Sequence, residues 1–384
     1  MKNFLYTLLL VAFNLGIIFL VLEGGYRIWL KINADSASIW SLRDSKENSE
    51  KIYVEPPVTL GRLIQKSSFH GRVYELMANI EAIYLGHPLR TNSFGMRGAE
   101  VGLDKPENVF RIAGIGDSVM FGWGVAEEDS YLKLLELDFE SEKGKGHELR
   151  IAQDKLETLN FAVPGYNTSM EVATYESLGR RFSPDILVLH FVENDFGVPQ
   201  FMSIPEDYSS LKKSFVKKEI KRIFRSYFPS SSGKVEAKSD LVGVEFRGTD
   251  TVSKKKVINQ YQYMLGHQGF KKALGRLHEL VCEDKVPVIL LTGKLKDSYK
   301  RLILEETRKY NFHVAEVYTK VNDYIRENNI EDTPKSRRQL LWVSENDSHP
   351  NALGHRLYAK ALREKIEEVL DMPVDQHFKS CIAQ

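Results

Sequence analysis

The chain is poor in cysteine, with only Cys282 and Cys381 among its 384 residues. Two cysteines cannot build a disulfide framework, and they cannot supply the paired spacing of a zinc finger. They could form a single bridge in an oxidising compartment. Cys282 lies in the stretch "LHELVCEDK", which has a helical pattern, so we predict that it is a buried free thiol.

An excess of charge of one sign is also missing. Lysine and arginine number 53 against 52 aspartate and glutamate, which leaves a net charge of +1. A balance this close to neutral argues against wholesale binding to nucleic acid, and we expect no nucleic-acid partner. With 42% hydrophobic and 27% charged residues, the composition predicts a packed core, in one large domain or two ordinary ones.

Two kinds of ligand site are excluded by spacing. The stretch "GIGDSVMFG" after residue 113 lacks the third glycine and the lysine of a phosphate-binding loop. His349 and His355 are six residues apart, on a loop and a helix start, which together with Asp347 is not a metal-ligand pattern. We therefore expect no cofactor and no metal.

A long apolar run is present at the N-terminus. No charge occurs from Asn3 to Leu22, and about 20 such residues suffice to cross the hydrocarbon core of a bilayer. Neither a small-x-small cleavage site nor a lipobox cysteine follows the run. We predict an uncleaved transmembrane signal anchor over residues 4–22, in preference to a cleaved signal peptide.

The orientation of this anchor is not decided by charge. Lys2 precedes the run, and Arg27 and Lys31 follow it, so the positive-inside rule barely discriminates. Everything after the helix would lie on one side of the membrane as a single soluble piece. The expectation is a single-pass membrane protein.

From residue 109 onward, strand and helix patterns alternate. Five apolar runs read as strands, namely 110–116, 157–162, 185–191, 286–293 and 312–317. Helical spacing falls between or after them, at 128–142, 169–182, 297–310 and 351–370. The alternation predicts an α/β fold whose parallel sheet is doubly wound and covered by helices on both faces. We assign this domain to residues 106–372, after an N-terminal extension over 33–105 in which 70–86 reads as a helix.

One segment, about residues 200–260, breaks the alternation and is treated as an insertion. Val216, Ile220, Ile223 and Tyr227 follow one another at helical spacing within a lysine-rich stretch. Such a basic amphipathic helix can lie on an anionic membrane surface. Packing of the apolar stripe on the domain is the favoured alternative. In either case the insertion could line or cover a site near Asn194.

Three polar or small residues follow predicted strand ends. Ser118, Gly165 and Asn194 each come just after a strand, at the edge where doubly wound sheets bind ligands. A serine becomes a nucleophile when a base takes its proton and donors stabilise the oxyanion. His349 is the candidate base. The backbone amides of Ser118 and Gly165, with the side-chain amide of Asn194, are candidate donors.

These residues lie in four blocks, "GIGDSVMFG", "NFAVPGYNT", "VENDF" and "DSHPNALGH". In this order they resemble the blocks of the SGNH (GDSL) hydrolases, and "RTNSFGMRG" resembles a stretch of membrane-anchored members, so the likeness spans about 92–370. It implies a flavodoxin-like three-layer α/β/α fold and esterase, lipase or acyl-transfer chemistry without a metal. It also implies Ser118 as nucleophile, Gly165 and Asn194 as oxyanion donors and His349 as base.

Two positions depart from the family pattern. Val192 replaces the usual glycine of the third block. In the last block, the position three residues before His349 is Asn346, and the aspartate, Asp347, is only two before. An aspartate holds the imidazole in the correct tautomer and stabilises its charged form. We predict that Asp347 does this, although a backbone carbonyl could replace it in a dyad.

Other polar and aromatic residues near the blocks have simpler interpretations. Asp117 is expected to bond within its own loop, and His355 to bond to backbone. Glu193 and Asp195 are expected to order a loop or face solvent. Trp123 and Phe121 could line an acyl pocket but are more often packing residues.

The resemblance leads to three hypotheses about function. The favoured one is a membrane-anchored serine esterase that hydrolyses an O-acyl or O-acetyl group on a cell-envelope glycan or lipid. The second is an O-acyltransferase that uses the same Ser-His site with a sugar hydroxyl as acceptor. The third is an inactive, membrane-tethered binding or assembly protein. In each case we expect an extracytoplasmic domain, in the periplasm or at the cell surface.

Overall fold

A computed structural model of the chain describes residues 2–33, 42–45, 50–143, 145, 149, 151–202, 214–217, 219–221, 259–295 and 297–381. The chain divides into two compact units. The first contains Met1–Ser38 and Ile204–Gly243, and the second contains Ile39–Ser203 and Val244–Gln384. Most of the predicted N-terminal extension therefore belongs to the same unit as the strands that follow it.

The second unit is built on a five-stranded sheet. Its strands are β6 (Val109–Ile115), β7 (Lys155–Asn160), β8 (Ile186–Phe191), β9 (Val288–Thr292) and β10 (His313–Glu316). They pair in parallel in the order β10-β9-β8-β6-β7. This is the flavodoxin-like order, and the five strands and their parallel pairing agree with the prediction. β6, β8 and β9 are buried along their whole length, as expected for strands covered on both faces.

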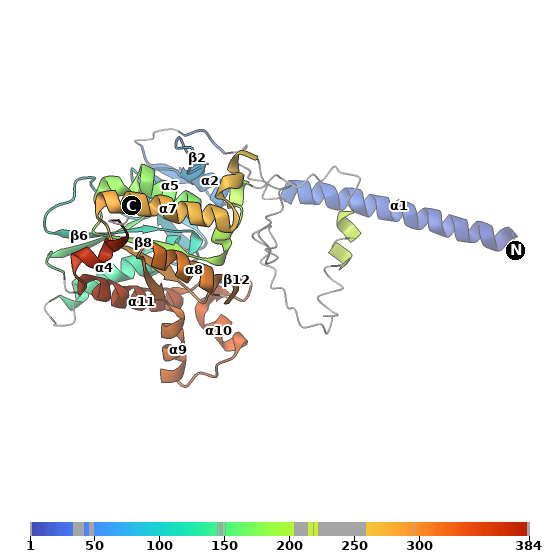
Figure 1. Ribbon diagram of the computed structural model, residues 1–384. Coiled ribbons are helices and arrows are strands. Elements are labelled where there is room, and N and C mark those ends of the chain that lie inside the picture. Colours follow the sequence, from blue (N-terminus) through green and yellow to red (C-terminus); the bar gives the residue numbers. More distant parts are fainter. Residues whose placement is uncertain are drawn as a thin grey trace. The chain divides into compact units, whose positions relative to one another are not determined.

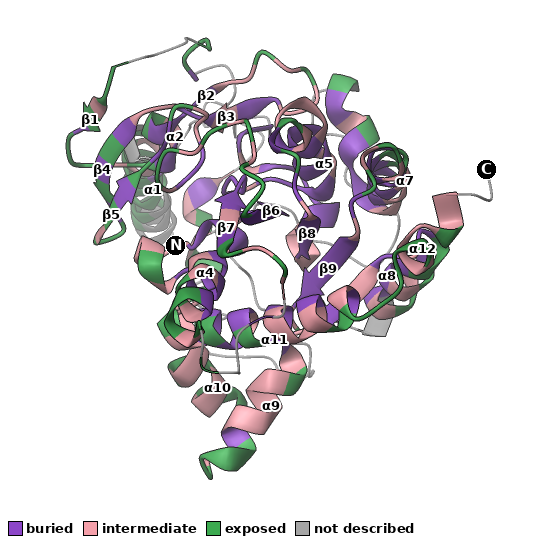
Figure 2. Cartoon of the chain, turned by 90° about the vertical axis from the view of Figure 1, so that its left-hand side faces the viewer, coloured by how far each residue is buried: buried purple, intermediate pink, exposed green. Residues whose placement is uncertain are grey.

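Helices cover both faces of the sheet (Figures 1 and 2). α5 (Thr168–Ser177) and α7 (Gly266–Asp284) lie on one face, and α4 (Tyr131–Glu142) and α11 (Ala352–Leu370) lie on the other. α8 (Asp297–Lys309) connects β9 to β10. The strand order reverses between the adjacent strands β6 and β8. In open α/β sheets, ligands bind outside the carboxyl ends of the strands at such a reversal.

Short helical turns connect several of these elements. They are α3 (Ser118–Phe121) and the 3-10 helices Glu127–Asp129, Gly179–Phe182, Glu193–Phe196, Gln200–Met202, Asn259–Met264 and Lys379–Cys381. α3 and the turn at Glu193–Phe196 follow β6 and β8 directly. The two adjacent central strands therefore each lead into a short helix at the same edge of the sheet.

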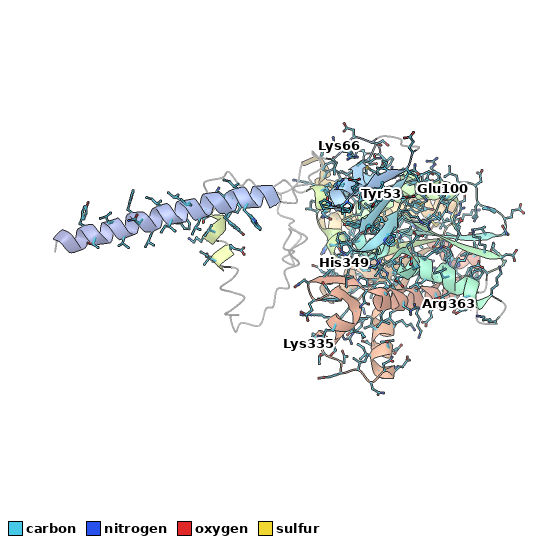
Figure 3. The ribbon with its side chains drawn as sticks, turned by 180° about the vertical axis from the view of Figure 1, so that it is seen from behind. Tyr53, Lys66, Glu100, Lys335, His349 and Arg363 are labelled. Carbon is cyan, nitrogen blue, oxygen red and sulfur yellow. A yellow bond between two sulfur atoms is a disulfide. The ribbon has the colours of Figure 1, made fainter. Side chains whose placement is uncertain are left out.

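A helical pair and a hairpin precede α11. α9 (Tyr318–Glu327) and α10 (Pro334–Leu341) extend from the rest of the second unit (Figure 1), and Lys335 on α10 is labelled in Figure 3. α10 leads directly into β11 (Trp342–Ser344), which pairs antiparallel with β12 (Asp347–Pro350). Asn351 caps the start of α11 by accepting the amide of Gly354 at 3.0 Å. The hairpin is thus fixed between two helices.

The predicted helix at 70–86 is wrong. β3 (Tyr74–Leu76) and β4 (Ile80–Tyr84) occupy this segment, and Asn79 and Leu85 have positive φ angles of 57° and 51°. Side chains of β4 alternate between buried and exposed, which is the period of a strand with one buried face. The left-handed turn at Leu85 and Gly86 reverses the chain into β5 (His87–Arg90).

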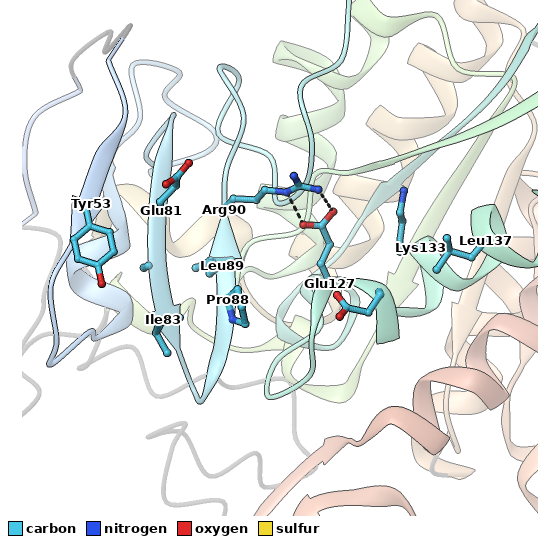
Figure 4. A pocket seen from close by; sticks show the side chains of 11 residues that line it. Tyr53, Glu81, Ile83, Pro88, Leu89, Arg90, Glu127, Lys133 and Leu137 are labelled. Carbon is cyan, nitrogen blue, oxygen red and sulfur yellow. Dashed lines mark hydrogen bonds and ion pairs between the residues drawn. The ribbon is translucent and has the colours of Figure 1, made fainter.

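These strands form two small sheets beside the main one. β4 lies between β1 (Ile52–Val54) and β5, while β2 (Ile64–Lys66), which follows α2 (Leu60–Leu63), pairs with β3. A hollow of about 560 Å³ lies over the exposed face of the three-stranded sheet (Figure 4). Arg90 on β5 forms two hydrogen bonds of 2.9 Å with Glu127 at its border. This ion pair ties the small sheet to the segment before α4.

Cys282 is not the free thiol that the sequence suggested. It forms a disulfide with Cys381, with a Cα–Cα distance of 5.7 Å, and is partly exposed. The two residues are 99 positions apart. The prediction failed because α12 (Val374–His377) and the turn after it return the end of the chain to α7, which local sequence patterns do not reveal.

The first unit contains α1 (Lys2–Asn33), which includes the apolar run at 4–22. In the part of the chain that the structure describes, no helix is both long enough and apolar enough to span a bilayer. Residues 215–217 and 219–221 are helical, in agreement with the helix expected in the insertion. Val216 and Ile220 of the predicted stripe are among them, whereas Ile223 and Tyr227 lie outside the described residues.

Candidate active site

Ser118 is the first residue of α3, immediately after the buried central strand β6. Asp117 caps this helix, because its Oδ1 accepts the amide of Val119 at 2.9 Å. A Cβ atom at Gly116 would lie 2.8 Å from the side chain of Met120 and 3.2 Å from that of His190. The glycine two residues before Ser118 is therefore needed for close packing. The strand, the glycine and the cap place a partly exposed serine at the sheet edge.

Ser118, His349 and Asp347 form one hydrogen-bonded chain, and His349 is labelled in Figure 3. The Nε2 atom of His349 lies 2.8 Å from the Oγ atom of Ser118. On the other side of the ring, Nδ1 lies 2.5 Å from Oδ1 of Asp347, which also accepts the backbone amide of His349 at 3.1 Å. The hydroxyl proton of Ser118 can therefore pass to a histidine whose ring is held by a carboxylate.

Asp347 remains a carboxylate in this arrangement. Burial alone would raise its pKa, but hydrogen bonds from the side chain and backbone of His349 and from Trp123 outweigh burial and hold the pKa below its usual value. A carboxylate facing Nδ1 favours the tautomer in which Nδ1 carries the proton and Nε2 is free to accept one.

The strand geometry of β12 explains why the aspartate stands two residues before the histidine. Side chains at positions i and i+2 of a strand point to the same face, so Asp347 and His349 lie side by side. Asn346 is exposed in the turn between β11 and β12, outside the paired residues Ser344 and Asp347. An acid at position 346 would not share this face.

Trp123 contacts both members of the pair, which the sequence did not indicate. Its Nε1 atom donates to Oδ2 of Asp347 at 3.0 Å, and its ring stacks on the ring of His349 at 5.1 Å between centroids. Tyr84 of the small sheet packs edge-on with the indole, at 5.5 Å between ring centroids. Packing was the favoured interpretation of Trp123. The one available signal was chemical, since a partly buried indole N–H usually has a partner.

Arg97 fixes the turn that carries Trp123. It lies in the "RTNSFGMRG" stretch, is only 7% exposed, and donates to the carbonyl oxygens of Phe121, Gly122 and Val125 at 2.6–2.8 Å. Burial lowers its pKa to about 10, so it remains a cation at neutral pH. One buried side chain thus holds the end of the helix that begins at Ser118 and the turn after it.

Asn194 and Gly165 lie after β8 and β7, as predicted. The side-chain amide of Asn194 donates to Oδ2 of Asp117 at 3.0 Å, and the same oxygen is 3.3 Å from Oγ of Ser118. Val192, which departs from the family pattern, has φ −127° and ψ 160°, an extended conformation that any residue can adopt. Glycine is therefore not required at position 192.

Two further histidines, His190 on β8 and His355 on α11, are fully buried. Nδ1 of His355 accepts the backbone amide of Tyr131 at 3.3 Å, so His355 bonds to backbone as predicted. Nδ1 of His190 lies 2.9 Å from the hydroxyl of Tyr131. Burial lowers the pKa of His190 to about 4 and that of His355 to about 3. Both imidazoles are neutral at neutral pH and bond to Tyr131, whereas His349 is the histidine that bonds to Ser118.

Two acids, Asp195 after β8 and Glu171 on α5, are also buried. Asp195 accepts the hydroxyl of Thr168 at 3.0 Å and the amide of Val192 at 3.3 Å, which orders the loop after β8. Burial raises the pKa of both carboxyl groups; repulsion by Asp195 and Asp117 raises that of Glu171 further, and repulsion by Asp117 raises that of Asp195. Asp195 thus orders the loop, as expected, and it is buried and not solvent-facing.

Comparison with known proteins found no matching family model and no matching curated sequence. Similar solved structures include LAE5, an alpha/beta hydrolase enzyme from the metagenome of Lake Arreo, Spain, which is 14% identical with a TM-score of 0.38 over 67% of this chain and 94% of that one. A putative lipolytic protein of the G-D-S-L family from Desulfitobacterium hafniense is 11% identical, with a TM-score of 0.37 over 66% and 98%.

A two-domain esterase active on acetylated mannans is 14% identical, with a TM-score of 0.38 over 68% of this chain and 50% of that one. Similar structures that are named for an activity include esterases and a lipase/acylhydrolase, which are enzymes that act on ester bonds. Likenesses of this strength do not identify a reaction. The chemistry of this chain therefore has to be argued from its own residues.

Replacement of Trp123 by phenylalanine is expected to lower kcat/KM for an ester about tenfold or more, because a hydrogen bond to a charged group contributes about 1.5–3 kcal/mol. Phenylalanine retains the stacked ring and removes only the N–H that holds Asp347. Steady-state kinetics across pH would measure the effect. Trp342→Phe, on the hairpin that carries Asp347, is the matched control, and its kcat/KM should stay near that of the wild type. Equal losses in both variants would assign the effect to packing of the hairpin.

Because the sequence predicts that the amide of Gly165 is an oxyanion donor, its replacement by alanine is expected to lower kcat by about 10²–10³-fold, the usual cost of losing one such donor. Gly165 has φ +80°, and an added Cβ would lie 2.6 Å from Cβ of Gln200. The turn must therefore shift, and its amide shifts with it. The kinetics of Gly165→Ala should be compared with those of Gly165→Ala/Gln200→Gly, which removes the clashing atom. Near wild-type kcat in the single variant would argue against a donor at this position.

Proposed function

We propose that this protein is a serine esterase of the SGNH type. The observation that carries the proposal is the chain of hydrogen bonds from Asp347 through His349 to Ser118, with heavy-atom distances of 2.5 and 2.8 Å. It lies at the carboxyl edge of the sheet, at the reversal of strand order. No other histidine nitrogen among the described residues forms a hydrogen bond with Ser118.

The proposed reaction proceeds in two steps. His349 Nε2 takes the hydroxyl proton while Ser118 Oγ attacks the ester carbonyl, and the tetrahedral intermediate collapses as His349 gives that proton to the leaving alcohol. The acyl group is then bonded to Ser118. Water attacks this acyl-enzyme after losing a proton to His349, and collapse releases the acid as the proton returns to Oγ. Asp347 stabilises the imidazolium in both steps.

We propose that the oxyanion is held by the amides of Ser118 and Gly165 and by the side chain of Asn194. Support comes from Asn194, whose amide nitrogen lies 3.0 Å from a carboxylate oxygen that is 3.3 Å from the nucleophile. That nitrogen has two hydrogens, and Asp117 uses one of them. The second remains for a substrate oxygen.

We further propose that residues 4–22 anchor the protein in a membrane and that the esterase domain is extracytoplasmic. Two observations support this. The run from Asn3 to Leu22 carries no charge, and the disulfide between Cys282 and Cys381 is of the kind that persists in oxidising compartments. At that location, O-acyl or O-acetyl groups on envelope glycans or lipids are the proposed substrates.

Covalent trapping tests the proposed chemistry. Full-length protein in detergent would be treated with a fluorophosphonate, digested and analysed by mass spectrometry, in parallel with turnover of an aryl acetate. We expect one adduct, on the peptide that contains Ser118, and loss of turnover in step with labelling. Ser177→Ala, a helical serine on α5, should label like wild type. A folded protein that neither labels nor hydrolyses any ester would instead favour the inactive binding or assembly hypothesis.

A further inference from the structure

Glu23, the first residue after the uncharged run, joins the N-terminal helix to the insertion within the first unit. Its carboxylate accepts the backbone amides of Phe215 at 2.8 Å and Val216 at 3.0 Å, and the hydroxyl of Ser214 at 2.8 Å. Glu23 is only 7% exposed. The insertion is therefore attached to α1 at the residue where the apolar run ends.

These contacts mark the start of a helix. The first amides of a helix have no partner within it, and a carboxylate at that end is favoured by the helix dipole. Ser214 Oγ accepts the amide of Lys217 at 3.2 Å, as an N-cap does, and Glu23 accepts the two amides between them. Arg27 binds Glu23 at 2.8 Å and lies over the ring of Phe215 at 4.9 Å.

The opposite face of this helix presents a distinctive surface. Lys217, Ile220 and Lys221 are exposed and stand at positions i, i+3 and i+4, so they share one face. Ile220 is 58% exposed, although Phe215 is buried against α1. An isoleucine between two lysines matches a lipid surface, since lysines bind phosphate groups while an apolar side chain enters the acyl boundary.

Aromatic residues next to Glu23 also favour a position at the level of the lipid headgroups. Tyr26 and Trp29 stack at 5.8 Å between ring centroids, and Trp29 is 55% exposed. They stand about 6 and 10 Å beyond Leu22 along the helix, at the usual rise of about 1.5 Å per residue. Tyrosine and tryptophan are enriched at this level of membrane proteins, beside the headgroups.

The charge of the surrounding sequence has the sign that an anionic surface requires. Between Leu211 and Phe228, the basic residues are Lys212, Lys213, Lys217, Lys218, Lys221, Arg222 and Arg225, against the single acid Glu219. Basic residues of an amphipathic segment add electrostatic attraction to anionic lipids. The overall charge of the chain is only +1, so this segment is a local concentration of positive charge.

We propose that the helix starting at Phe215 is a lipid-surface element that binds anionic headgroups through Lys217 and Lys221 and inserts Ile220, with Glu23 holding it at the membrane interface. The inference rests on the membrane anchoring proposed above and is independent of the esterase chemistry. Of the two interpretations of the insertion, this proposal favours contact with a membrane surface over packing of the apolar stripe on the domain.

Fluorescence at position 220 tests the proposal. Full-length Ile220→Cys protein, labelled with the fluorophore NBD, would be reconstituted into vesicles of phosphatidylcholine alone or of phosphatidylcholine with phosphatidylglycerol. We expect a blue shift and a severalfold rise in emission in the anionic vesicles, reversed by high salt because exposed charges are screened. Lys217→Glu/Lys221→Glu should abolish the response, and Glu23→Gln should weaken it. Lys335→Glu, an exposed lysine of the second unit, should leave it unchanged.

Two parallel measurements separate the possible failures. Alkaline carbonate extraction reports whether the protein stays in the membrane, and turnover of an aryl acetate reports the esterase. A water-exposed probe in both kinds of vesicle, in protein that resists extraction, would overturn the lipid-surface proposal and leave the anchor standing. Equal insertion with and without phosphatidylglycerol would overturn the role of the lysines. Extraction by carbonate would overturn the anchor and with it this inference, whatever the turnover.

Discussion

Ser118→Ala is expected to lower kcat for an aryl acetate by up to about 10⁶-fold, the loss in kcat that removal of the serine causes in subtilisin. The methyl group cannot form the acyl-enzyme, and little in the site can replace it. Ser118 is partly exposed at the start of α3, and alanine lacks only its hydroxyl, so the substitution should not disturb the fold. The measurement is steady-state kinetics on purified variants, with thermal unfolding to show that both proteins are folded.

The same experiment contains its own consistency test. His349 forms a hydrogen bond with Ser118 at 2.8 Å, and residues that act as a unit give non-additive losses. His349→Ala should therefore cost about as much as Ser118→Ala, and the double variant should cost hardly more than either. Additive losses would mean that the two residues act separately. Substantial activity in Ser118→Ala would remove the serine from the reaction.

The central sheet was predictable because the apolar composition of its strands reflects their burial. The run Ile186–Phe191 is apolar except at His190, as expected for a strand covered on both faces, and helical periods fall between or after most of the predicted strands. The short strands of the N-terminal part were not predictable in this way. In the segment 70–86, apolar and polar residues fit both periods, and positive φ angles at Asn79 and Leu85 break the chain where a helix would continue.

The position of the candidate site was predictable, whereas its supporting contacts were not. Ser118, Gly165 and Asn194 follow strand ends, so topology alone brings them to one edge. The pairing of His349 with Asp347 was predicted. The contacts of Trp123 and Arg97 join segments that are far apart in the sequence, and no local sequence pattern indicates that they meet. Arg97 belongs to the stretch "RTNSFGMRG", which the sequence singled out only because it resembles a stretch of membrane-anchored SGNH hydrolases. Its side chain donates to carbonyl oxygens of a turn 24 to 28 residues later.

The stability of the folded protein at acid pH provides a separate test of the ionisation state of Asp347. Its pKa is lower in the folded protein than in the unfolded chain, so its ionised form contributes stability above the unfolded value, and this contribution is lost as the pH falls through the folded pKa. The wild type should therefore lose more stability on acidification than Asp347→Asn does. Thermal midpoints of both proteins across the acid range would measure the difference. Parallel curves would mean that Asp347 is not held as a carboxylate by its partners.

Asp347→Asn is expected to lower kcat by about 10⁴-fold, as it does when the acid of a Ser-His-Asp triad is replaced by its amide. An asparagine preserves the shape of the site, but it can donate to Nδ1 and so favour the wrong tautomer of His349. The fold should be retained, because the hairpin of β11 and β12 is closed by backbone pairs. A loss below about tenfold would instead mean that backbone orients the histidine.

The neighbouring residue provides the decisive comparison. Asn346→Asp/Asp347→Asn restores an acid three residues before His349, the spacing typical of the family, yet Asn346 is exposed in the turn and Asp347 shares the strand face of the histidine. We therefore expect no recovery of kcat. Trp123, in the turn that follows Ser118, donates a hydrogen bond of 3.0 Å to Asp347. Asp347 is therefore held both by His349 and by Trp123, and an acid outside the strand cannot take its place. Recovery toward wild type would show that the hairpin rearranges and that spacing, not the strand face, selects the acid.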